Sequence, residues 1–163
     1  DDANSALASK SKPGAKLEQV AAPAPANAAL AKALEGEPVS IVQDAGRIAI
    51  TLRNERQFAL NSTLPVPELW ALFQKIAVAL DKAPGAIVVT GYADALPTRS
   101  YPSNVELSAA RARSVARIMA PKLAEPKRLT AQGKGEAEPL AANDTDANRA
   151  KNRRVTIVLT PTP

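Results

Sequence analysis

Residues 102–120 read PSNVELSAARARSVARIMA, and this stretch carries the clearest helix signature in the chain. Ser103 is the predicted N-cap, and Glu106 three residues later completes a capping box. Helical spacing then separates an apolar face from a set of arginines that lie at other angles. The predicted core-facing residues are Leu107, Ala110, Val115 and Ile118, and the arginines are Arg111, Arg113 and Arg117. The helix should end by Pro121.

Short apolar runs on both sides of this helix predict the strands of a sheet. Residues 86–90 form a buried run of the strand type and lead into a polar loop at 91–102. Residues 128–133 and 155–159 supply two further short strands. Between them, residues 142–153 are polar and predict a loop followed by a short helix.

The first half of the chain predicts two helices and a hairpin. Asn27 is the expected N-cap of a short helix that stops at Gly36. Two short runs of alternating apolar residues follow, joined by a turn at 44–46, so one face of each run should be buried. The alternating residues are Val39, Ile41, Ile48, Ile50 and Leu52, and helical spacing returns at Leu69, Phe73, Ile76 and Leu80.

The order of these elements predicts an α+β fold, in which helices pack on one face of a small mixed sheet. We expect this domain to span residues 27–163. Residues 1–26 are rich in Ala, Pro and Lys, without apolar periodicity, and are predicted to form an extended, flexible linker. The chain begins at Asp1 and contains one methionine, so we expect a fragment or a processed product whose membrane anchor lies outside it.

The composition argues against several classes of protein. The 163 residues contain no cysteine and no histidine, which removes disulfides, Ser-His and Cys-His catalysis, and thiolate or imidazole metal sites. No pair of carboxylates indicates a hydrolase, so we expect no enzyme, no catalytic residue, no metal and no cofactor. The net charge of +5 suits either an anionic partner or ordinary solubility. Nucleic acid is not expected, because aromatic residues are only 3% and Phe58, Trp70 and Phe73 are expected in the core.

Three groups of polar residues are candidates for a binding site, and each also has a structural interpretation. Asp94 follows the strand at 86–90, where it can present a carboxylate to a ligand or turn its own loop. Arg111 lies about two turns after Asn104 on one side of the predicted helix, and its planar guanidinium suits a ligand carboxylate or a salt bridge. The cations of residues 148–154 can bind anions, form a solvated face, or pair with Asp94 inside the fold.

Four ordered motifs together resemble the OmpA-like family. They are Gly91-Tyr92-Ala93-Asp94, the stretch 102–112, Arg128-Leu129-Thr130-Ala131-Gln132-Gly133-Lys134-Gly135, and Asn148-Arg149-Ala150-Lys151-Asn152-Arg153-Arg154-Val155. The resemblance covers about residues 38–160. It implies an OmpA-like α/β sandwich that binds the peptide stem of peptidoglycan non-covalently and without catalysis.

The resemblance also implies roles for particular residues. In such domains an Asp and an Arg hold the diaminopimelate of the stem peptide, which points to Asp94 for its ammonium and Arg111 for its carboxylate. Asn104 is expected to line the site, and residues 58–62 correspond to the first ligand loop. The other positions matched by motif are Asn61 on that loop, together with Arg149 and Arg153, for which a structural role is at least as well supported.

Departures from the family pattern affect the expected strength of binding. Tyr92 and Ala93 replace the usual His and Thr beside Asp94, and Val105 replaces a common Trp. These replacements keep open a second class of function, a protein-interaction module that retains the fold but has lost its ligand.

The loop before the helix and the upstream segment resemble two inner-membrane groups. One is the C-terminal extension of the type VI secretion protein TssL, which we favour, and the other is the flagellar stator protein MotB. Either resemblance implies a periplasmic domain of a bacterial inner-membrane protein that ties its machine to the cell wall. In the first case the other subunits of the type VI secretion membrane complex are expected partners.

Overall fold

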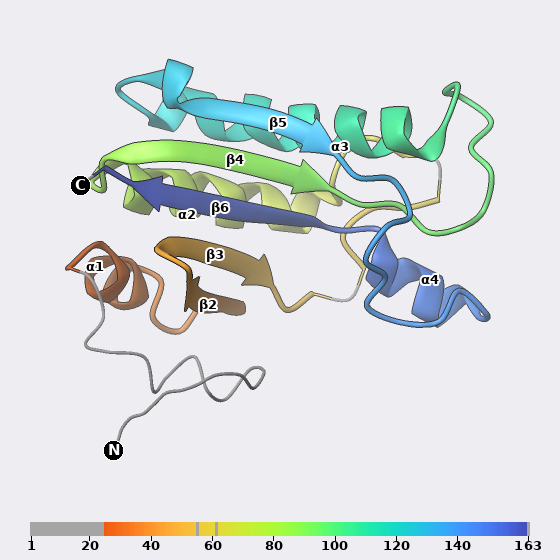
Figure 1. Cartoon of the computed structure of the whole chain (residues 1–163), viewed down its shortest axis with the longest axis horizontal. Helices are drawn as coiled ribbons and strands as arrows, with labels where there is room; N and C mark the ends of the chain where they lie inside the picture. The colour runs from red at the N-terminus through yellow and green to blue at the C-terminus, as the bar shows by residue number, and fades with distance from the viewer. Residues whose placement is uncertain (1–24, 55, 61, 163) are drawn as a thin grey trace.

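The computed structural model describes residues 25–54, 56–60 and 62–162, which form a five-stranded mixed sheet with α2 and α3 against one face (Figure 1). The predicted α+β class is confirmed. The helices are α1 (Pro25–Ala33), α2 (Trp70–Asp81), α3 (Asn104–Met119) and α4 (Asp146–Asn152). The strands are β2 (Val39–Asp44), β3 (Arg47–Leu52), β4 (Gly85–Gly91), β5 (Leu129–Gly133) and β6 (Val155–Pro161). Single 3-10 turns, η3 to η5, occupy Pro67–Leu69, Ala120–Lys122 and Pro126–Arg128.

The sheet has the strand order β2-β3-β6-β4-β5. All neighbouring strands are antiparallel except β4 and β5, which are parallel and are joined through α3. Two rows of buried aliphatic side chains run across the three central strands, and each of them is 0% exposed. One row consists of Ile48, Leu159 and Ile87, and the other consists of Ile50, Ile157 and Val89. This apolar face carries the core, as the alternation of the sequence predicted.

The hairpin between β2 and β3 closes through a turn of two residues, as predicted. Ala45 has φ 53 and Gly46 has φ 77, so both lie in the left-handed region. Short hairpin turns with two left-handed residues match the twist of their strands. Glycine adopts this conformation without steric cost, whereas alanine does not.

Two glycines allow α3 to approach the sheet closely. A Cβ atom on Gly91 would lie well under 3.0 Å from the carbonyl oxygen of Ser108, and one on Gly133 would meet the backbone of Ala109 equally closely. Gly91 ends β4 and Gly133 ends β5, so the first half of α3 lies directly against the ends of both strands. The hydroxyl of Ser108 fixes this contact by accepting a hydrogen bond from the N–H of Gly135 at 2.8 Å.

The start of α3 confirms the predicted N-cap. The Ser103 hydroxyl accepts a hydrogen bond from the Glu106 N–H at 3.2 Å. Within the described part of the chain the reciprocal bond from Ser103 N–H to the Glu106 side chain is absent, so half of the capping box forms. Leu107, Ala110 and Val115 are buried as predicted, whereas Ile118 is only half-buried.

Two sequence predictions about single residues were wrong. Asn27 does not cap the first helix, because α1 already begins at Pro25, whose fixed φ and missing N–H suit a first helical position. The Asn27 side chain instead donates to Gln43 Oε1 at 3.1 Å. Trp70 is not a core residue, since Leu69 takes the buried position and Trp70 remains 40% exposed.

Candidate ligand-binding site

Asp94 lies just beyond the end of β4 and is almost fully buried, with 4% of its surface exposed. The backbone before it is held on both sides, because Tyr92 N–H donates to the Arg154 carbonyl and Ala93 N–H to the Gly135 carbonyl, each at 2.8 Å. Its carboxylate accepts one bond from Leu96 N–H at 3.0 Å. The strand end therefore presents a fixed, buried negative charge.

Arg111 is buried in the structure, which corrects the prediction that it lies apart from the core-facing residues. Only 1% of its surface is exposed, because it stands four residues from both Leu107 and Val115 and so shares their face of α3. Its Nε donates to the Ser62 carbonyl at 2.7 Å and its Nη2 to the Ala59 carbonyl at 3.3 Å. Its third donor nitrogen, Nη1, is buried and has no hydrogen-bond partner among residues 25–54, 56–60 and 62–162.

The electrostatic environment of Arg111 disfavours its charge. Burial, and to a smaller extent the positive charge of Arg153, lower the pKa of the Arg111 guanidinium to about 10, although Asp94 partly opposes this decrease. The Phe58 ring lies under the guanidinium, with its centroid 5.2 Å from Cζ. An additional anion next to Nη1 would therefore stabilise the charged form.

Arg153 forms a buried ion pair with Asp94. Its Nη1 donates to Asp94 Oδ2 at 2.7 Å, and the two side chains are only 3% and 5% exposed. Its Nε donates to the Phe58 carbonyl at 3.0 Å. Of the alternatives for the basic cluster, the structure thus shows pairing with Asp94 inside the fold. Arg111 and Arg153 together hold the loop that begins at Phe58.

Asn104, the first residue of α3, lies beside Asp94 as the motif implied. Its amide nitrogen donates to the Asp94 carbonyl at 3.3 Å and to Glu136 Oε1 at 3.0 Å. Its amide oxygen, Oδ1, is buried and has no hydrogen-bond partner in the described part of the chain. Glu136, on the loop after β5, was not foreseen from the sequence, and nothing in its local pattern marks it.

One other predicted site residue, Arg149, does not join this group. Arg149 bonds to Asp146 Oδ1 at 3.1 Å and to the Asn143 carbonyl at 3.5 Å, both within α4 or the loop before it. These contacts support a structural role for Arg149. Asn61 lies outside the described residues.

Tyr92, which replaces the usual histidine, has Arg154 as its partner, whereas Asp94 pairs with Arg153. Its ring is buried and stacks under the Arg154 guanidinium, whose Cζ lies 3.9 Å from the ring centroid. Arg154 Nη2 also donates to the Glu138 carbonyl at 2.9 Å. Burial lowers the pKa of Arg154, and Tyr92 and Glu138 oppose this decrease. The replacement therefore builds a cation–π contact under the loop after β5.

The group as a whole suits a small ligand that carries both signs of charge. Arg111 and Arg153 contribute two positive charges against the one negative charge of Asp94. Among the residues that the structure describes, Arg111 Nη1 is a donor without a partner and Asn104 Oδ1 is an acceptor without one. Buried polar atoms without partners are rare and costly. A ligand carboxylate would accept a hydrogen bond from Arg111 Nη1, and a ligand ammonium would donate one to Asn104 Oδ1.

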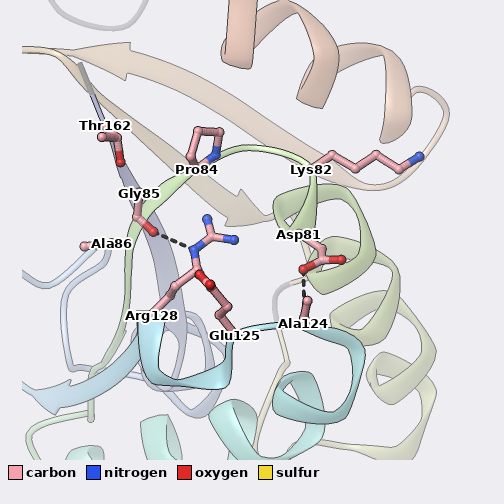
Figure 2. Close-up of a pocket in the computed structure, with 9 residues that line it drawn as sticks. All are labelled: Asp81, Lys82, Pro84, Gly85, Ala86, Ala124, Glu125, Arg128 and Thr162. Carbon is pink, nitrogen blue, oxygen red and sulfur yellow. Dashed lines mark hydrogen bonds between the residues drawn. The ribbon is translucent and has the colours of Figure 1, made fainter.

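A separate cavity of about 520 Å³ lies at the opposite end of β4 (Figure 2). Arg128 lines it, but its guanidinium is already bound to backbone carbonyls, with Nε donating to Gly85 at 2.8 Å and the other nitrogens to Leu80 and Ala83. Two of these carbonyls lie at the carboxyl end of α2, where a cation is favoured. Arg128, the first residue of its motif, therefore has a structural role.

Metal and membrane features can be assessed for the described residues only. Residues 25–54, 56–60 and 62–162 contain no group of three acidic side chains placed to hold a metal ion. In the same part of the chain no helix has the length and apolar character needed to cross a bilayer.

The fold is that of the OmpA-like class of domains. Residues 57–153, more than half of the chain, match the OmpA family, and the chain belongs to that family. Among curated proteins it is 33% identical over 129 residues to the probable lipoprotein YiaD of Escherichia coli, covering 78% of this chain and 58% of YiaD. It is 35% identical to the peptidoglycan-binding protein ArfA of Mycobacterium tuberculosis, covering 58% of this chain and 28% of ArfA. The chain thus spans little more than half the length of YiaD and less than a third of the length of ArfA.

Solved structures extend the similarity to two cell-envelope machines. The cell wall anchor of the type VI secretion system of Pseudomonas aeruginosa is 35% identical, with a TM-score of 0.69, over 82% of this chain and 97% of that one. The periplasmic domain of Helicobacter pylori MotB is 27% identical, with a TM-score of 0.67, over 79% of this chain and 83% of that one.

Proposed function

We propose that this chain is a non-catalytic peptidoglycan-binding domain that anchors a type VI secretion membrane complex to the cell wall. It holds the diaminopimelate of the stem peptide and lies in the periplasm, below a membrane anchor that belongs to the same protein. The observation that carries the proposal is the buried, unpartnered Nη1 of Arg111 next to the Asp94–Arg153 pair.

The chemistry of diaminopimelate matches this group. Its side-chain end carries an ammonium and a carboxylate on one carbon, so a site needs a donor fork and an acceptor close together. Arg111 Nη1 is the donor for the carboxylate. Asp94 has already accepted two bonds, but a carboxylate has about four acceptor positions, and Asn104 Oδ1 adds another. Arg153 acts by holding Asp94 in place.

The choice of machine rests on similarity. The type VI secretion wall anchor matches nearly its whole length to this chain at 35% identity. Under this proposal, the other subunits of the type VI secretion membrane complex are partners. A MotB-like stator anchor is the second candidate, and the TM-score of 0.67 with MotB supports it.

A third candidate is a protein-interaction module without a wall ligand. The burial of Arg111 and Asp94, which are 1% and 4% exposed, favours it, because little of either side chain is open to solvent.

Co-sedimentation with isolated sacculi tests the proposal. The wild type should sediment with diaminopimelate-containing sacculi, and Arg111→Lys should not, because lysine keeps the charge but loses the fork. Arg113→Ala is the matched control, since Arg113 is exposed on the same helix, two residues away, and its loss should leave binding intact. Circular dichroism must show that each variant is folded.

The outcomes separate the candidates. Absence of binding by the folded wild type would reject the wall ligand and favour the interaction module. Equal loss in Arg111→Lys and Arg113→Ala would reject the specific site. Deletion of the gene distinguishes the machines, because a type VI anchor affects secretion and a stator anchor affects swimming.

A further inference from the structure

We propose that Trp70 forms a second subsite, which stacks on a sugar of the peptidoglycan glycan strand while the Asp94 site holds the stem peptide. This inference rests on the proposed wall-binding function and deepens it. It predicts that the domain distinguishes a stem peptide attached to its sugars from the same peptide alone.

Trp70 is exposed and yet held in place. It is the only tryptophan of the chain and is 40% exposed at the first position of α2. Its indole N–H donates to the Pro65 carbonyl at 3.0 Å, so the polar edge of the ring is already satisfied. Pro65 and Pro67 also restrict the backbone just before it. A ring fixed in this way loses little conformational freedom when it binds a ligand.

Other exposed apolar side chains precede Trp70 on the same segment of the chain. Leu60 is 52% exposed and Leu64 is 55% exposed, both within ten residues of Trp70. A β-bridge between Phe58 and Pro65 closes this segment into a loop. Three large exposed apolar residues on one short segment indicate a contact surface more than scattered single ones do.

The segment connects Trp70 directly to the Asp94 site. Arg111 holds the Ser62 carbonyl, and Pro65, whose carbonyl accepts from the indole, follows three positions later. Three residues span at most about 11 Å, so the indole nitrogen lies within roughly 17 Å of the Arg111 guanidinium. Both α2 and α3 begin at the end of the sheet where Asp94 lies, which places Trp70 at that same end (Figure 1).

This distance suits a muropeptide. Two amino acids, a lactyl group and the side chain of diaminopimelate itself lie between the carboxylate held by Arg111 and the sugar, and this path of about five residue lengths reaches on the order of 17 Å when extended. A ligand with diaminopimelate next to Arg111 can therefore bring its sugar to Trp70. The apolar C–H face of a pyranose ring carries slight positive charge and suits the electron-rich face of an indole.

The test compares two ligands, the tripeptide stem L-Ala-γ-D-Glu-diaminopimelate and the disaccharide that carries this tripeptide. Calorimetry should show that the wild type binds the disaccharide form about 2- to 12-fold more tightly, the range expected for one aromatic contact. Trp70→Ala should bind both ligands equally, and Trp70→Phe should keep part of the difference. Val78→Ala is the matched control, because Val78 is exposed on the same helix about 12 Å further along.

Fluorescence gives an independent measurement in the wild type, since Trp70 is the only emitter of its kind. The disaccharide ligand should shift or quench its emission, and the tripeptide should not. Equal affinities in the wild type, or a sugar advantage that survives in Trp70→Ala, would overturn the subsite and leave wall binding intact. If neither ligand binds, the proposed function and the subsite are both wrong.

Discussion

Removal of the Asp94 carboxylate should destabilise the fold, because it leaves Arg111 and Arg153 buried without a counter-ion. The pair with Arg153 is 2.7 Å long and its side chains are 5% and 3% exposed. Two unit charges about 4 Å apart interact by about 4 kcal/mol at an effective dielectric constant of about 20. Loss of one partner from such a pair typically costs about 3–5 kcal/mol. We therefore expect Asp94→Ala to lower the free energy of unfolding by about 3–5 kcal/mol at neutral pH.

Urea denaturation followed by circular dichroism measures this loss, and a double-mutant cycle assigns it to the pair. Asp94→Ala with Arg153→Met should lose about 2–4 kcal/mol less than the sum of the two single losses. Asp146→Ala is the control, because its ion pair with Arg149 is exposed and should contribute less than about 1 kcal/mol. A loss below about 1 kcal/mol for Asp94→Ala, or additive single losses, would refute the coupling. The same experiment shows whether binding measured on this variant reflects the site or the fold.

Three further predictions follow from single features of the structure. Ala45→Asn should raise the free energy of unfolding by about 0.5–1 kcal/mol in thermal denaturation, because asparagine tolerates the left-handed turn better than alanine; an unchanged or lower melting temperature would contradict this. Gly91→Ala should cost about 2–3 kcal/mol in urea denaturation, because its Cβ would collide with the Ser108 carbonyl; a wild-type midpoint would show that α3 moves away freely. The affinity for a carboxylate ligand, measured by titration calorimetry, should stay constant up to about pH 9 and weaken as the pH rises through the Arg111 pKa of about 10, because only the protonated guanidinium attracts the carboxylate. A decrease of affinity near neutral pH would point to another group.

Features that depend on neighbouring residues could be predicted from the sequence. The hairpin follows from alternation and a glycine-containing turn, and the start of α3 follows from Ser103. The same helical spacing also places Arg111 on the face of Leu107 and Val115. Its burial was missed because Arg111 was grouped with Arg113 and Arg117 at other angles of the helix, although its spacing of four from Leu107 and Val115 indicated the core.

Features that join distant segments could not be predicted from spacing. Asp94 and Arg153 are 59 positions apart, and the sequence offered their pairing only as one of three alternatives. The carbonyl groups that Arg111 binds belong to backbone, which leaves no trace in residue identity. Tyr92 was considered only for its effect on the strength of binding, whereas its stacking under Arg154 depends on the residue before a strand that begins 63 positions later.

The positions of the chain ends bear on how such a domain carries mechanical load. Helix α1 and the carboxyl end of β6 lie at the end of the sheet opposite to Asp94 (Figure 1). A force applied between α1 and a ligand at Asp94 therefore acts along the strands. In antiparallel pairs such as β3–β6 and β6–β4 the hydrogen bonds run perpendicular to the strands. Such a pull shears many bonds at once and does not open them one after another, so the sheet resists it as a unit.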